Sequence, residues 1–147
     1  MTGKEGRSFA ELLDHLFREV HPAGRGPYTY AEASLGIREA TGVSISASAI
    51  QQLRRGTNRN PKMQTIRALA GFFGVTPGYF FDEDEAERQR AEIRLVAAMR
   101  DQNVLRVALR ADGLSTSSMN MVSTVIEQAR KLEGMPETDI SDLLDDE

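Results

Sequence analysis

The chain has 147 residues, with 18 lysines and arginines against 22 aspartates and glutamates, and no cysteine. This length accommodates one or two small domains, and the lack of cysteine excludes disulfides, thiolate nucleophiles and cysteine-based zinc sites. No apolar run approaches the roughly 20 residues of a membrane-spanning helix, and residues 1–8 lack the apolar core of a signal peptide. The sequence therefore predicts a cytoplasmic protein.

Residues that catalysis or metal binding would need are scarce. His15 and His21 stand six positions apart, and no carboxylate cluster is arranged around them. An active site needs a nucleophile with a base, a carboxylate pair in a cleft, or a metal. The sequence therefore predicts neither an enzyme nor a metal or cofactor site.

Charge divides the chain into two unlike parts. Residues 1–81 contain ten Lys or Arg and six Asp or Glu, a net charge of +4, whereas residues 82–147 contain eight and sixteen, a net charge of −8. Asymmetry of this kind points to a basic binding domain joined to an acidic partner domain. We therefore expect a binding domain over residues 1–81, a helical domain over residues 82–135 and an acidic tail over residues 136–147.

The chain should open with a helix. A capping box at residues 8–11 precedes an apolar repeat of helical spacing that continues to residue 20. Residues 21–27 then form a loop, because two prolines and two glycines interrupt them. A phosphate-binding glycine loop is disfavoured there, since no strand precedes it and no Gly-Lys-Ser follows.

A second helix should follow this loop. A capping box from Thr29 to Glu32 predicts a helix that runs to about Ala40 and stops at Gly42. Gly36 lies inside it, where glycine costs about 1 kcal/mol relative to alanine. Its presence suggests that another helix packs closely against this one.

The helix expected after Ser46 carries the most informative pattern of the chain. Its apolar positions 47, 50 and 53 fall on one side. The other side follows the spacing i, i+3, i+4, i+7 of a single helix face and bears no carboxylate: Ser48, Gln51, Gln52 and Arg55. Glutamine pairs with adenine edges and arginine with guanine, so this face suits a DNA major groove. An ordinary solvated amphipathic helix is the alternative.

The flanking residues favour the DNA interpretation. Arg54 and Arg55 complement the dipole at the end of this helix. The next segment, residues 57–62, has two cations and two asparagines where a loop could hold phosphates. No acidic residue occurs between Glu39 and Asp82, although the chain as a whole is acidic.

A further apolar stripe predicts a helix over residues 64–73, followed by an aromatic turn at residues 75–81. The aromatic side chains of these segments could stack single-stranded bases. Because they continue a helical periodicity and lack basic neighbours, we interpret them as part of the core.

The second domain should contain helices over residues 85–100, 104–109 and 115–132. So small a domain cannot bury its apolar stripes alone, and pairing with a second copy is the economical solution. Packing onto the first domain within one monomer is the alternative. The expected dimer face comprises Ile93, Val96, Met119, Val122, Val125, Ile126, Ala129 and Leu132.

The last segment, residues 137–147, mixes acidic with apolar residues. A disordered acidic tail is the default for such a terminus. Docking of one helical turn on a partner, or shielding of the basic face, are the alternatives.

Several segments resemble a known family. Residues 45–56, with the Asn60-Pro61 and Tyr79-Phe80 pairs that follow, resemble the lambda-repressor-like (Xre-type) helix-turn-helix domain. Stretches at residues 22–27 and 110–114 resemble, more narrowly, the EspR-like family of actinobacterial nucleoid-associated regulators. This likeness spans about residues 9–134, and its strongest motif is the helix after Ser46.

The resemblance implies an all-α protein, with an N-terminal helix-turn-helix domain and a small C-terminal dimerisation domain. It implies that Ser48, Gln51 and Gln52 read bases and that the residues after them grip the DNA backbone. Ala49 departs from the aromatic residue common at its position. The full DNA-binding set is Thr29, Ser46, Ser48, Gln51, Gln52, Arg54, Arg55, Thr57, Asn58, Arg59, Asn60 and Lys62.

The sequence thus predicts a dimeric, sequence-specific regulator of transcription that binds double-stranded DNA in the nucleoid, with no cofactor. The alternative is a helical protein-interaction adaptor, or an antitoxin-like module, without a direct DNA role. The acid-free stretch argues against that alternative, because an adaptor gains nothing from it.

Overall fold

The computed structural model describes residues 7–138, and every regular element in this range is helical. The all-α prediction is therefore confirmed. The chain divides into two compact units, one ending at Arg94 and one beginning at Leu95. The predicted acidic tail lies, from residue 139 onward, outside the described residues.

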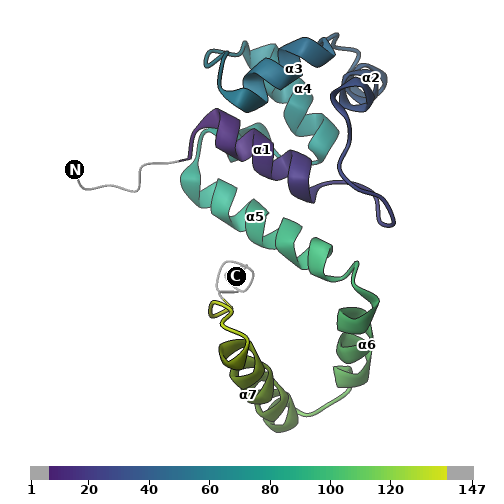
Figure 1. The fold of residues 1–147 in the computed structure, drawn as a ribbon, viewed down its shortest axis with the longest axis vertical. Coiled ribbons are helices and arrows are strands. Elements are labelled where there is room, and N and C mark those ends of the chain that lie inside the picture. The colour runs from purple at the N-terminus through teal and green to yellow at the C-terminus, as the bar shows by residue number, and fades with distance from the viewer. Residues whose placement is uncertain (1–6, 139–147) are drawn as a thin grey trace, which may run out of the picture. The chain divides into compact units, whose positions relative to one another are not determined.

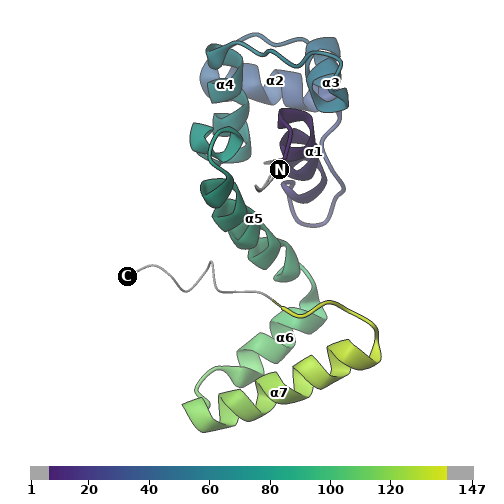
Figure 2. The same ribbon diagram turned by 90° about the vertical axis from the view of Figure 1, so that its left-hand side faces the viewer.

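The first unit consists of short helices around one apolar core (Figure 1). The helices are α1 (Phe9–Glu19), α2 (Tyr30–Thr41), α3 (Ala47–Arg55), α4 (Met63–Phe73), the 3-10 helix η1 (Pro77–Phe80) and the first part of α5 (Glu83–Ala98). Figure 2 shows α2, α3 and α4 close together beside α1. Their inward side chains form the core: Leu12, Leu13, Leu16, Phe17, Ala33, Ile37, Ile50, Leu53, Leu69 and Phe73.

A buried tyrosine fixes η1 to α1. The Tyr79 side chain is completely buried, and its hydroxyl donates a hydrogen bond to the Leu12 carbonyl oxygen at 3.1 Å. Burial raises the pKa of Tyr79 to about 12, so the hydroxyl keeps its proton near neutral pH. The core interpretation of the aromatic segment holds for Phe73 and Tyr79, whereas Phe81 is 60% exposed.

Helix boundaries follow the capping signals of the sequence. Thr29 Oγ1 accepts the Glu32 backbone N–H at 3.1 Å, and the Thr29 N–H donates to the Glu32 carboxylate at 3.0 Å, which completes the predicted capping box. At Ser8 the box is half formed, because the Glu11 carboxylate meets the Ser8 hydroxyl and not its backbone N–H. Gly42 ends α2 in the left-handed conformation, with a φ of 75°.

Close packing at Gly36, expected from its place inside a helix, is present in the structure. A Cβ built at Gly36 would collide with the ring of Phe72 on α4. That ring packs against Tyr28 and Phe73, with ring centroids 5.3 Å and 4.9 Å away, so it has little room to move. Glycine here lets α2 and α4 approach.

Gly36→Ala should therefore destabilise the first unit, although alanine is the better helix former by about 1 kcal/mol. Overpacking of a filled interface costs about 1–3 kcal/mol, and urea unfolding measures the change. The matched control is Gly71→Ala on α4, whose Cβ would rest 3.6 Å from Thr41 Cγ2, an ordinary contact. Equal stability of the two variants would contradict the close approach at Gly36.

The first unit extends past the boundary predicted at residue 81. On α5, Ala86 and Ala91 are 0% and 4% exposed, and the guanidinium of Arg90 pairs with Glu83 at 3.3 Å. The acidic residues Glu83, Asp84 and Glu85 form the first turn of α5, and this helix packs on the core because its alanines permit close approach. Ile93, predicted to lie in the dimer face, also packs against this core.

The second unit contains the end of α5 together with α6 (Gln102–Ala111) and α7 (Thr116–Leu132). None of its described residues is buried. Val96, Val125 and Leu132 are 60%, 65% and 89% exposed. The apolar stripes of this unit therefore have no cover within the described chain. Among residues 7–138, no helix is both long and apolar enough to span a membrane.

Candidate nucleic-acid interface

Helix α3 presents a polar face outward because its apolar side chains anchor it to the core. Ile50 and Leu53 are 0% and 2% exposed. Ser46 begins the helix, and its Oγ accepts the Ala49 backbone N–H at 3.0 Å. The opposite face is set by this anchoring: Ser48, Gln52 and Arg55 are exposed, and Gln51 is half-exposed.

The polar groups of this face can both donate and accept hydrogen bonds. Gln52 Nε2 lies 3.5 Å from Ser48 Oγ, one turn away on the same face. Glutamine amides match the donor and acceptor pair of adenine in the major groove. The described contacts of Gln51, Gln52 and Ser48 involve no carboxylate, so the face is chemically suited to base edges.

The segment after α3 folds back on the end of that helix. Gly56 takes a left-handed conformation with a φ of 79°, and the N–H groups of Thr57 and Asn58 both donate to the Gln52 carbonyl oxygen. The side chain of Asn58 accepts the Asn60 N–H at 3.1 Å. These bonds hold the loop, while its polar side chains stay exposed: Thr57, Asn58, Arg59, Asn60 and Lys62.

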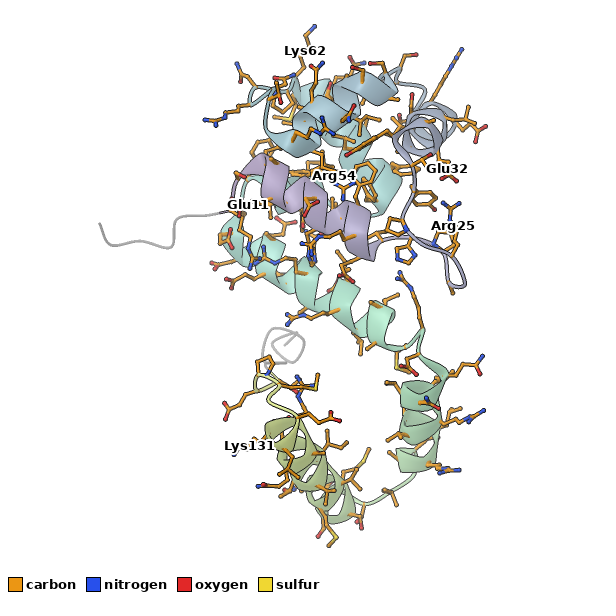
Figure 3. The ribbon with its side chains drawn as sticks, viewed as in Figure 1. Glu11, Arg25, Glu32, Arg54, Lys62 and Lys131 are labelled. Carbon is orange, nitrogen blue, oxygen red and sulfur yellow. The ribbon has the colours of Figure 1, made fainter. Side chains whose placement is uncertain are left out.

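Three cations of this surface carry uncompensated charge. Within residues 7–138, Arg55, Arg59 and Lys62 take part in no ion pair; the ion pairs there involve Arg18, Arg25, Arg54 and Arg90. Lys62 projects away from the helices in Figure 3. We call the exposed residues of α3 and this loop the α3 surface: Ser48, Gln51, Gln52, Arg55, Thr57, Asn58, Arg59, Asn60 and Lys62.

A hollow of about 420 Å³ lies beside the start of α3. Ala49 lines it together with Ser46, Asn60 and Lys62. Ala49 is half-buried against the core, so it serves packing and borders the hollow at once.

The predicted contact Thr29 is the N-cap residue of α2. Its N–H and hydroxyl oxygen are both engaged with Glu32 in the capping box. The Arg25 guanidinium donates two hydrogen bonds, of 2.6 Å and 2.8 Å, to the Glu32 carboxylate. Figure 3 shows the two side chains together near the loop before α2. The Arg25 guanidinium and the Thr29 N–H lower the pKa of Glu32 to about 2.

Arg54 differs from the other predicted contacts. Figure 3 shows its side chain directed between α3 and α1, where its Nε pairs with Asp14 Oδ1 at 2.9 Å. Only 22% of the Arg54 side chain is exposed. The reason is geometric: Arg54 precedes Arg55 by one residue, a rotation of about 100° around the helix, which turns it from the outer face toward the core.

Comparison with known proteins places the chain in a family. No protein-family model matches it. The nucleoid-associated protein EspR of Mycobacterium tuberculosis, from strains H37Rv and CDC 1551, is in both cases 39% identical over 128 residues. The aligned segment covers 87% of this chain and 96% of each relative. The chain belongs to the EspR family.

Sequence reasoning missed the residues that organise the α3 surface in this EspR-family chain. Asp14, Phe17 and Tyr30 all contact Arg54, yet they lie 24 to 40 residues from it in sequence. Their spacing on α1 and α2 marks them only as helix residues. Among the described residues, no group of His, Asp and Glu is arranged to hold a metal ion.

Proposed function

We propose that this chain binds double-stranded DNA as a nucleoid-associated regulator of transcription, with α3 in the major groove. The observation that carries the proposal is the α3 surface, where three cations that form no ion pair within residues 7–138 flank a carboxylate-free polar face in a net-acidic chain. A nucleoid-associated relative, EspR, supports the location. The short turn between α2 and α3 supports a helix-turn-helix of the Xre type.

Within this proposal the residues of the α3 surface divide by chemistry. Ser48, Gln51 and Gln52 contact base edges, because hydroxyl and amide groups offer both donors and acceptors. Arg55, Arg59 and Lys62 contact phosphates, which position the helix without reading sequence. Ser46 and the polar loop residues Thr57, Asn58 and Asn60 add backbone contacts. Thr29 contributes by capping α2 and holding its start in place.

The proposed functional form is a homodimer joined through the second unit. No described residue covers the apolar stripes of α6 and α7. Large exposed apolar patches of this kind mark association surfaces. Two joined copies would present two α3 helices to DNA. A symmetric pair reads half-sites spaced by whole turns of the duplex.

Binding of the wild-type chain to a short fluorescent duplex of mixed sequence, measured by anisotropy over a range of salt concentrations, tests the proposal. Two protomers with three cations each offer six phosphate contacts. The slope of log K against log salt should be about −5, with an affinity loss of about 10³-fold between 50 and 200 mM salt. No duplex binding at low salt would contradict the proposal and favour a protein-interaction adaptor.

A further inference from the structure

We propose that Arg54 is a positioning residue for duplex recognition: clamped by Asp14, Phe17 and Tyr30, it fixes the end of α3 and makes no phosphate contact. The inference rests on the proposed function and deepens it. It assigns opposite roles to two neighbouring arginines that the sequence places together in the predicted DNA-binding set.

The clamp joins three helices through one guanidinium. Arg54 Nε pairs with Asp14 Oδ1 of α1 at 2.9 Å. The Arg54 Cζ atom lies 4.9 Å from the ring centroid of Phe17 on α1 and 5.8 Å from that of Tyr30 on α2, distances at which cation–π attraction acts. Arg54 Nη1 also lies 3.5 Å from the Tyr30 hydroxyl.

This arrangement leaves Arg54 unsuited to a phosphate. To reach DNA, the guanidinium would have to leave a carboxylate and two aromatic rings. The Arg54 side chain is only 22% exposed and that of Asp14 39%, so the pair is less screened by solvent than a fully exposed one. The other oxygen of Asp14 accepts a hydrogen bond from Arg18 Nε at 2.9 Å, so Asp14 pairs with two arginines.

Removal of the Asp14 charge distinguishes a clamp from a purely electrostatic effect, because the two explanations predict opposite changes in duplex binding. It is a carboxylate held against the end of the helix proposed to enter DNA. If charge alone mattered, Asp14→Asn should tighten duplex binding, because a repulsive charge is lost. If Asp14 holds Arg54 and thereby α3, the same change should weaken recognition of the preferred sequence.

The test compares Arg54→Lys, Arg54→Gln, Asp14→Asn and the neighbour control Arg55→Gln. Two probes are used: a duplex selected from a random library by the wild-type chain, and a scrambled duplex of equal composition. Affinity is measured for both probes across salt. Amide hydrogen exchange of residues 47–57 is followed without DNA. Arg54→Lys keeps the charge but loses the planar fork and stacking, and it is the mildest change for folding.

Arg55→Gln should lower the magnitude of the salt slope by about 0.9 for each protomer and should weaken binding of both probes equally. The Arg54 and Asp14 variants should keep the wild-type slope. Their affinity for the selected duplex should fall about tenfold or more, whereas their affinity for the scrambled duplex should change little. Hydrogen exchange in α3 should be faster in these variants and unchanged in Arg55→Gln.

The inference would be overturned by a salt slope that Arg54→Gln reduces as much as Arg55→Gln does, or by tighter binding of both probes to the Asp14→Asn variant. An Arg54→Lys variant that keeps full selectivity would contradict a clamp that depends on the planar guanidinium. If the wild-type chain binds no duplex, the proposed function fails by itself. Hydrogen exchange then still decides whether Asp14 and Arg54 hold α3, and unchanged exchange would refute the clamp.

Discussion

Arg55→Glu combined with Lys62→Glu is expected to lower duplex affinity by about 10³-fold at moderate salt. Both side chains are exposed and carry charge that no carboxylate of the described residues compensates. In the proposed complex, the double variant would remove two phosphate contacts from each protomer and set carboxylates against the DNA backbone. Like charges brought together cost several kcal/mol, and every 1.4 kcal/mol is about tenfold in affinity. Anisotropy titration of the short duplex measures the effect.

The control changes the net charge equally at another place. Arg88→Glu with Arg94→Glu alters two exposed arginines of α5, outside the α3 surface. Near-wild-type affinity of this control, with thermal unfolding unchanged in both double variants, would locate binding on the α3 surface. If the control lost as much affinity, net charge and not a defined surface would govern binding.

Val125→Glu combined with Ile126→Glu should convert the proposed dimer to a monomer. These neighbours on α7 are 65% and 44% exposed, and two buried carboxylates at an apolar interface would not be tolerated. Sedimentation velocity reads the change in mass directly. The slope of duplex affinity against salt should fall to about half, because one protomer supplies half the phosphate contacts.

Thr124→Glu with Gln128→Glu is the matched control, because both positions are already polar and exposed on α7. It adds the same charge to the same helix and should leave the dimer intact. A wild-type chain that sediments as a monomer at tens of micromolar would contradict the dimer itself. If both double variants lost the dimer equally, general charge repulsion between chains would explain the loss.

Much of the first unit follows from local signals in the sequence. Ser46, Thr29 and Gly42 mark helix ends by chemistry that acts over three or four residues, and the structure places the ends of α2 and α3 there. The outer face of α3 follows from its periodicity alone. Such features are predictable because cause and effect lie within one helical turn.

The remaining features depend on contacts that no local pattern encodes. Helical periodicity puts Arg55 on the outer face and turns Arg54 away from it, but the partner of Arg54, Asp14, lies 40 residues earlier and no local pattern predicts it. The boundary at residue 81 was set by charge, whereas Ala86 and Ala91 extend the core along α5 because of their small size. Ile93, expected in the dimer face, is partly buried against the core of the first unit.

The placement of the tyrosines has an optical consequence. The chain contains no tryptophan and three tyrosines, and all three, Tyr28, Tyr30 and Tyr79, belong to the first unit. Intrinsic ultraviolet emission therefore reports on that unit alone, and one of its sources, Tyr30, stands beside the Arg54 guanidinium. Circular dichroism measures the helices of both units. Tyrosine emission and circular dichroism together therefore distinguish unfolding of the first unit from unfolding of the second without any added label.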